Sequence, residues 1–502
     1  MILKKSMRRI FFAILAVSAM ASSIACGKSD SAGPSAAAAS ADGGKILIST
    51  KSDEARKEFI EGRDLAEKLR GQESVAHFDK ALALDPDFAF AELARANSAP
   101  TAKDFFEHLN KSVALAGKAS EGERLLILAN EAAANGEVVK QKEYLDQLVA
   151  AHSNDERALF NLGNYYFGQQ EYEQAIAHYK KATELAPNYS PAYNILGYAY
   201  RQQGNYQDAE QAFKKYIELI PNDPNPYDSY AELLLKMGRF DDSIAEYRKA
   251  LSMDSHFVPS HFGIAADLMY QGKHNDAAAE LQRMVDQARN DGELRTAYFG
   301  MAVVAVDSGK LDQAVQQMDK EYAVAENKND AASMAADLQA KGNIIAEMQR
   351  YDLAQQQFDR SLQLVEASNL SQAIKDNAKL QHHFNLTVLA IGKKDYAAAK
   401  NHAQEYRAGA DASRNPGQVK LAHELAGRIA LAEKDYTTAI AELDQANDQD
   451  PRNLYRLSQA YQAKGDHAKA QDYLKKAAEF NSLPQLNYAF IRAKAKKTRN
   501  AS

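Results

Sequence analysis

The sequence predicts an all-α protein, a solenoid of about a dozen antiparallel helix pairs, and three observations support this fold class. The first is a repeat: residues 161–187 read NLGNYYFGQQEYEQAIAHYKKATELAP and residues 195–221 read ILGYAYRQQGNYQDAEQAFKKYIELIP. The second is that apolar residues recur at helical spacing within each copy. The third is the proline that closes each copy, Pro187 and Pro221, because a helix cannot continue through it.

Each copy contains two helices separated by a polar turn. In the first copy, Leu162, Gly163 and Tyr166 lie on one side of a helix. After the turn, Ala175 and Tyr179 lie on one side of the next helix. The small residues let the two helices approach closely, and the aromatic ring fills the space beside them. A single pair cannot bury both of its apolar faces, so the pairs must stack.

The matching positions of the two copies identify a known repeat. They are Leu162/Leu196, Gly163/Gly197, Tyr166/Tyr200, Ala175/Ala209, Tyr179/Phe213 and Pro187/Pro221. This pattern resembles the tetratricopeptide repeat, a 34-residue helix-turn-helix with the signature W-x2-L-G-x2-Y, then A-x3-F, then P. Leu159 and Tyr193 take the place of the tryptophan. The resemblance implies a right-handed superhelix whose concave wall is formed by the first helix of each pair.

The repeat extends over nearly all of the chain after the N-terminal region. Turn glycines recur on one 34-residue grid, at Gly136, Gly204, Gly238 and Gly272. We predict a repeat array over 49–291, regular in 156–291, and a divergent array of the same kind over 292–490. The last residues, 491–502, contain RAKAKKTRNAS and are predicted to be a basic, disordered tail.

The N-terminus has the layout of an export signal. Residues 1–25 place four basic residues before the apolar segment FFAILAVSAMA, which is too short for a stable transmembrane helix. The segment SSIAC resembles a bacterial lipoprotein signal with acylation at Cys26, the one cysteine of the chain. The alternative is cleavage after Ala21, which leaves Cys26 free. Residues 26–48 then form a lipidated cysteine and a flexible, Ser/Ala/Gly-rich tether.

Charge and motifs argue against nucleic-acid binding and catalysis. The formal charge is −6, and it becomes more negative once Lys4, Lys5, Arg8 and Arg9 leave with the signal, whereas nucleic-acid binders are basic. His423 and Glu424 are not followed by the second histidine of a zinc protease helix. Neighbouring His382 and His383 point about 100° apart on a helix and do not converge on one ion. We therefore expect no enzyme activity, no cofactor and no metal.

The resemblance also implies where partners bind. In this family, peptides dock on the concave side of the first helices, where asparagines can pair with a peptide backbone and aromatic rings can anchor side chains. Mapped onto this sequence, the candidate groove comprises Phe160, Asn161, Asn164, Phe167, Asn194, Tyr198, Arg201, Asp228, Glu232, Phe262, Met269 and Tyr270.

These features predict a membrane-anchored, extracytoplasmic scaffold that binds protein or peptide partners in the cell envelope. In a Gram-negative host it would be held on the outer membrane and face the periplasm; the alternative location is secreted or periplasmic and soluble. The alternative function is a glycan- or nutrient-binding surface lipoprotein, although the absence of tryptophan disfavours sugar stacking. The identity of the partner and the oligomeric state stay open.

Overall fold

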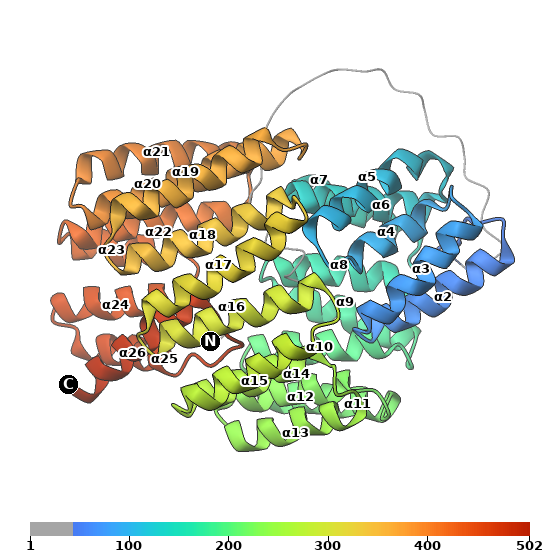
Figure 1. Cartoon of the computed structure of the whole chain (residues 1–502), viewed down its shortest axis with the longest axis horizontal. Helices are drawn as coiled ribbons and strands as arrows, with labels where there is room; N and C mark the ends of the chain where they lie inside the picture. Colours follow the sequence, from blue (N-terminus) through green and yellow to red (C-terminus); the bar gives the residue numbers. More distant parts are fainter. Residues whose placement is uncertain (1–43, 502) are drawn as a thin grey trace.

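A computed structural model describes residues 44–501, which form helices joined by short turns (Figure 1). The first helices are α2 Asp53–Glu67, α3 Gly71–Leu84, α4 Ala89–Asn97, α5 Ala102–Leu115, the 3-10 turn η1 Ala116–Lys118, α6 Glu121–Asn135, α7 Val138–Ala151, α8 Glu156–Gly168 and α9 Tyr172–Leu185. The next are α10 Ser190–Gln202, α11 Tyr206–Leu219, α12 Asn225–Lys236, α13 Phe240–Met253, α14 Val258–Tyr270, α15 His274–Gln287, α16 Asp291–Asp307 and α17 Leu311–Asn327. The last are α18 Ala331–Glu347, α19 Tyr351–Ala367, α20 Gln372–Gly392, α21 Tyr396–Ser413, α22 Pro416–Ala432, α23 Tyr436–Leu443, α24 Pro451–Ala463, α25 His467–Ala478 and α26 Leu486–Ala501.

Consecutive helices pack as pairs, α2 with α3 through α24 with α25, and each pair stacks on the next. These twelve pairs confirm the predicted all-α solenoid. The predicted close approach within a pair is also present. A Cβ atom on Gly163 of α8 would lie 2.5 Å from Cε1 of Tyr179 in α9, and a Cβ on Gly197 would lie 2.8 Å from Phe213. The aromatic ring thus occupies the place that a side chain on the glycine would need.

Longer helices explain why the 34-residue grid slips downstream. Helices α8–α15 have 12 to 14 residues, whereas α16–α21 have 17 to 21. Each added turn of helix lengthens the repeat and extends the interface with the neighbouring pair.

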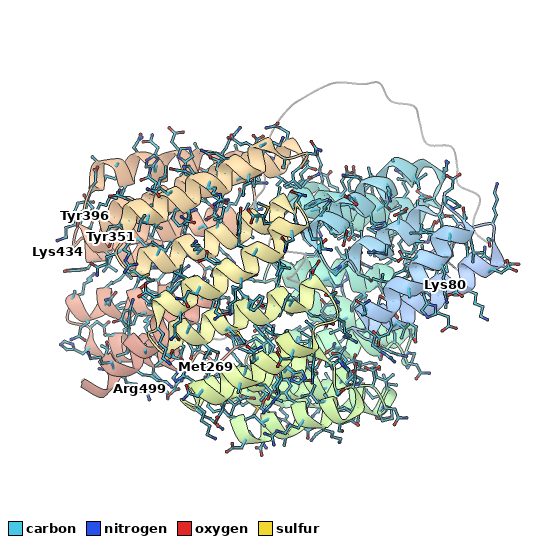
Figure 2. The ribbon with its side chains drawn as sticks, viewed as in Figure 1. Lys80, Met269, Tyr351, Tyr396, Lys434 and Arg499 are labelled. Atoms are coloured by element: carbon cyan, nitrogen blue, oxygen red, sulfur yellow. The ribbon has the colours of Figure 1, made fainter. Side chains whose placement is uncertain are left out.

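The turn inside each pair needs one residue with a left-handed backbone. Glycine fills this position in most regular repeats, as at Gly204 (φ 75°) and Gly238 (φ 77°), and Gln170 fills it between α8 and α9 with φ 67°. In the later repeats Gln349, Lys394 and Lys434 adopt the same conformation, with φ of 58°, 61° and 67°. These later turns, marked by Tyr351, Tyr396 and Lys434, lie along one edge of the molecule (Figure 2).

The superhelix closes on itself, so that its first pairs touch later ones. Helix α5 packs beside α18, and the Lys103 amide donates to Oδ2 of Asp330 at 3.2 Å (Figure 1). Ser371 Oγ donates to Oδ1 of Asn135 at 2.6 Å, and Lys420 Nζ lies 2.7 Å from Oε1 of Gln170. The repeats therefore enclose an interior space.

The segment before the first helix packs on the array, which corrects part of the predicted tether. The amide of Ile46 donates to Oδ2 of Asp155 at 2.9 Å, and Ser120 Oγ donates to the carbonyl of Leu47 at 2.7 Å. Residues 44–48 are thus held by the N-cap side chains of α8 and α6, which have a second oxygen or a hydroxyl proton to offer after capping their helices. The predicted signal peptide, Cys26 and the rest of the tether lie outside the described residues.

The predicted disordered tail is wrong for its described part, residues 491–501. These residues belong to α26, which packs on α16, α24 and α25. Arg492 is 5% exposed and Ala495 is fully buried, because an apolar stripe is interleaved with the lysines. No helix within residues 44–501 is long and apolar enough to cross a bilayer.

Candidate ligand-binding cavity

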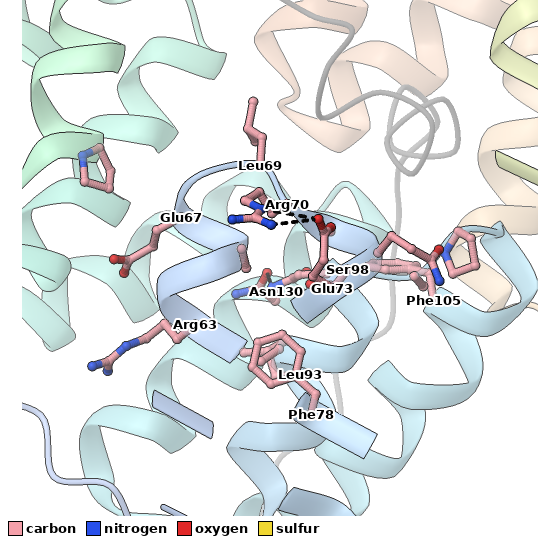
Figure 3. A pocket seen from close by; sticks show the side chains of 18 of the residues that line it. Arg63, Glu67, Leu69, Arg70, Glu73, Phe78, Leu93, Ser98, Phe105 and Asn130 are labelled. Carbon is pink, nitrogen blue, oxygen red and sulfur yellow. Dashed lines mark hydrogen bonds and ion pairs between the residues drawn. The ribbon is translucent and has the colours of Figure 1, made fainter. Parts of the chain in front are cut away.

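The enclosed space contains a cavity of about 740 Å³ (Figure 3). Residues from α2, α4, α6, α8 and α10 form one side of it, and the turns at 254–259 and 289–296 form the other. The wall therefore combines the first helices of the N-terminal pairs with a segment that approaches from a later part of the superhelix. This volume falls in the range of ligand-binding sites.

Aromatic rings make up much of the wall. Phe160 of α8 meets Tyr189, the residue before α10, edge to face with ring centroids 5.5 Å apart. In the same wall, Phe59 of α2 lies 5.2 Å from Phe90 of α4. Phe105 of α5 completes this part of the wall. Such rings offer apolar surface to a side chain of a ligand.

The best-connected charged group in the wall is Arg157 of α8. Its guanidinium binds Glu67 of α2 through two nitrogens, at 3.0 and 3.3 Å, and Glu156 at 2.7 Å. The carboxylates raise the pKa of Arg157 against the opposing effect of burial, so the group stays protonated. The same guanidinium lies over the ring of Tyr189 at 4.9 Å. Arg157 thus ties α2 to α8 and the start of α10.

Two further ion pairs line the cavity. Arg70 binds Glu73 at 3.1 Å, drawn with dashed lines in Figure 3. On the opposite side, Arg289 binds Glu293 at 2.7 Å. In each pair the two residues are three or four positions apart in the sequence. These ion pairs therefore do not link the two sides of the cavity.

A second cavity, of about 500 Å³, adjoins the first. Pro100, Pro259 and Gly292 line both, and a Cβ on Gly292 would lie 2.5 Å from the carbonyl oxygen of Pro100. Glycine is needed at this point because the two parts of the superhelix meet there. Leu483 and Leu486, near the C-terminus, form part of the wall of the second cavity.

Four residues of the predicted groove lie in these walls. Phe160, Asn161 and Asn194 line the larger cavity, and Phe262 lines the smaller one. Asn164 lies behind the wall, where it accepts a hydrogen bond from the Tyr179 hydroxyl at 2.8 Å.

Phe167, also predicted in the groove, lies on α8 with its ring edge to face with Tyr172, at 5.3 Å between ring centroids. Neither Asn164 nor Phe167 lines either cavity.

The prediction of an open groove is wrong for the other six residues, which are buried. They are Tyr198, Arg201, Asp228, Glu232, Met269 and Tyr270. Arg201 binds Glu232 at 3.1 Å, and the Tyr198 hydroxyl donates to the same carboxylate at 3.0 Å. These side chains therefore pair with one another across neighbouring repeats instead of facing a ligand.

Met269 and Tyr270 are covered by the C-terminal segment. The hydroxyl of Tyr270 donates to the carbonyl of Ser482, and Arg492 donates to the carbonyl of Met269 at 3.0 Å. Residues 480–495 thus occupy the concave face of α14, where the sequence analysis predicted an open groove.

Arg63 and Arg157 are wall residues that the sequence prediction missed. Aligning Gly62 with Gly163 places Arg63 at the position of Asn164, which was predicted in the groove. The repeat alignment could therefore have identified Arg63. Among residues 44–501, no group of three or more His, Cys, Asp and Glu side chains is placed to hold a metal ion.

Family comparisons agree with this architecture. Three models, each described as tetratricopeptide repeat, match residues 128–190 and 162–224, residues 200–256 and residues 451–482. The matched segments of the chain are therefore tetratricopeptide repeats. Such repeats stack into helical scaffolds with extended concave surfaces, which supports a role in protein–protein interaction.

Solved structures with similar folds include a tetratricopeptide repeat protein from Parabacteroides merdae. It is 16% identical, the match covers 52% of this chain and 98% of that one, and the TM-score is 0.35. PilF from Pseudomonas aeruginosa is 19% identical over 44% of this chain and 90% of its own, with a TM-score of 0.31. MamA from Desulfovibrio magneticus is 17% identical over 34% and 97%, with a TM-score of 0.29. No curated protein matches the sequence.

Proposed function

We propose that this protein is a membrane-anchored, extracytoplasmic scaffold that binds an extended peptide segment of a partner protein in the 740 Å³ cavity. The observation that carries the proposal is the cavity itself. Its wall is built from the first helices of successive repeats, and it offers aromatic surface beside polar side chains. A site of this kind suits a peptide, which presents apolar side chains and main-chain amides together.

The anchoring part of the proposal rests on the N-terminal sequence. The signal-like residues 1–25 and Cys26 favour export and lipidation. Lys45 and Ile46, near the end of the predicted tether, line the cavity. An anchor at Cys26 would therefore lead from the membrane directly to the wall of the binding site.

Site-specific photo-crosslinking in native cells tests the binding. A benzophenone amino acid at position 160 faces the cavity, and the same amino acid at position 353 is a matched control, because Leu353 is 47% exposed on the outer helix α19. We expect an adduct at position 160 that maps to one segment of one protein, and none at position 353. Equal adducts at both positions, or none at position 160, would contradict binding in the cavity.

Mass spectrometry of the mature N-terminus tests the anchor. Acylated Cys26 in the membrane fraction is the expected result. A chain that begins at Ser22 in the soluble fraction would remove the anchor and leave the cavity proposal standing.

A further inference from the structure

Nearly all charged groups in the wall of the larger cavity are paired within the chain. Six carboxylates line it, and each accepts a hydrogen bond: Glu67, Glu73, Asp155, Glu156, Asp254 and Glu293. The cations Lys45, Arg70, Arg157 and Arg289 each pair with one of them. The other two carboxylates, Asp155 and Asp254, accept main-chain amides, so every carboxylate in the wall has a hydrogen-bond donor within the chain.

Arg63 of α2 is the exception. Its half-buried guanidinium lies 5.6 Å from the ring of Phe59, and within residues 44–501 it has no hydrogen bond and no ion pair. It extends from the same side of α2 as Glu67 (Figure 3), but Glu67 is bound by Arg157. Burial, together with repulsion from Arg157, lowers the pKa of Arg63. A cation in such a place is stabilised when an anion joins it.

Asn194 of α10 is a second unpaired polar group in the same wall. The residue is 7% exposed, and its Oδ1 is buried without a hydrogen-bond partner. Its side-chain amide has no hydrogen bond within the described residues. Buried polar groups are nearly always hydrogen-bonded, so an unpaired one that lines a cavity points to a ligand. A side-chain amide both donates and accepts, which matches the two groups of a peptide unit.

We infer that the cavity binds an acidic peptide, in which an Asp or Glu side chain pairs with Arg63, a main-chain amide pairs with Asn194 and an apolar side chain packs against Phe160. This inference rests on the proposed peptide-binding function and adds the chemistry of the partner. The acidic group is a side chain within the peptide, because the larger cavity adjoins the second one at Pro100 and Gly292, which gives an extended peptide room to continue.

Two matched peptide libraries test the inference on the full mature chain in detergent. The peptides have about eight residues, which extend to at most ~28 Å, and amidated C-termini. One library carries a single Glu among Phe, Leu, Ser and Asn, and the other carries Gln at the same position. We expect the best Glu peptides to bind about tenfold more tightly than their Gln counterparts, measured by fluorescence anisotropy.

Three variants assign this preference to Arg63. Arg63→Gln should weaken the Glu peptides about tenfold and leave the Gln peptides unchanged, which removes the preference. Arg63→Lys keeps the charge and should keep part of the preference. Arg350→Gln is the control, because Arg350 is exposed on the turn before α19 and is remote from the cavity wall. If Arg63→Gln still binds the Glu peptides more tightly than the Gln peptides, the inference is wrong.

Asn194→Leu tests the second contact. It should weaken both libraries alike while the melting temperature stays the same or rises, because replacing an unpaired buried amide by an apolar group of similar size removes a desolvation cost. Unchanged peptide binding in Asn194→Leu would overturn the assigned role of Asn194.

The other outcomes separate this inference from the proposed function. If Glu and Gln peptides bind equally, the cavity binds peptides but the acidic preference is wrong. A preference only for peptides with a free C-terminal carboxylate would overturn the side-chain assignment. If no peptide from either library binds to the folded protein, or a fatty acid binds more tightly than every peptide, the proposed function fails as well.

Discussion

The hydroxyl of Tyr270, in α14, donates a hydrogen bond to the main-chain carbonyl of Ser482, 212 residues later in the chain. The amide of Ser482 donates back to the same hydroxyl at 3.2 Å. One side chain thus satisfies both main-chain groups of a residue in an irregular segment. Together with the edge-to-face contact of Tyr270 and Tyr488, at 5.5 Å between ring centroids, this contact holds the C-terminal segment in the concave face.

Tyr270→Phe should loosen that segment. The change leaves the main-chain groups of Ser482 buried and unpaired, which costs about 1–3 kcal/mol. We expect faster hydrogen exchange at residues 479–490, measured by mass spectrometry. Tyr247→Phe is the matched control, because the Tyr247 hydroxyl is buried and has no partner, so its removal should be neutral or stabilising. Equal effects of the two variants would argue against the contact.

Arg492→Met should lower the free energy of unfolding more than Tyr270→Phe does. Arg492 binds Asp307 at 3.0 Å and donates to the carbonyl of Tyr270 at 2.9 Å, and both partners lie in another part of the superhelix. Removing one member of a buried ion pair costs about 3–5 kcal/mol, because the other charge stays buried. The urea midpoint of unfolding measures the loss.

Lys494→Met, on the same helix, is the control for Arg492→Met. Its pair with Glu347 is 2.7 Å long but half-exposed, and such surface pairs contribute about 0–1 kcal/mol. If the urea midpoint of Arg492→Met is as high as that of Lys494→Met, the contacts of Arg492 with Asp307 and Tyr270 do not stabilise the fold.

The repeat pattern of the sequence was enough to predict the pairing of helices, because it follows from contacts between neighbours. Gly163 against Tyr179 and Gly342 against Phe358 are separated by one turn between helices, so each contact is visible within one copy. The later copies were harder to align, since Gln349 and Lys394 take the left-handed turn position that glycine marks elsewhere.

The binding surface was predicted less well, because it depends on contacts between distant repeats. The position of Tyr270 on its helix is that of a groove residue, but Ser482 covers it. Likewise, Arg201 and Glu232 are on the expected side of their helices, yet they pair with each other. Nothing within one repeat shows how far the superhelix closes.

Two glycines of α8 give a direct test of helix packing. Gly163→Ala would place a Cβ 2.5 Å from Tyr179, so the ring or the helix must move, at a cost of about 1–3 kcal/mol. Gly168→Ala, at the end of the same helix, meets no atom within 4 Å and should be neutral or stabilise by up to about 1 kcal/mol, since alanine favours helix. Thermal melts of both variants measure the difference. A Gly163→Ala protein as stable as Gly168→Ala would mean that the pair does not pack as described.

Asp267 of α14 should make stability depend on pH. Burial raises its pKa to about 8, and repulsion from Asp241 adds to the shift. Its usual value is about 4, so between these values the folded protein holds a proton that the unfolded chain has released. The free energy of unfolding therefore falls as the pH rises from about 4 to about 8, by up to about 1.4 kcal/mol per pH unit from this group.

Asp267→Asn isolates this contribution from the other buried carboxyls. Burial and repulsion from Glu232 also raise the pKa of Asp228, so part of the pH dependence should remain in the variant. Because asparagine has nearly the same shape and no charge, Asp267→Asn should be more stable than the natural protein at pH 8 and similar at pH 5. Urea denaturation at the two pH values measures both. A variant that loses equal stability at pH 5 and pH 8 would show that the carboxyl of Asp267 does not take up a proton in the folded protein.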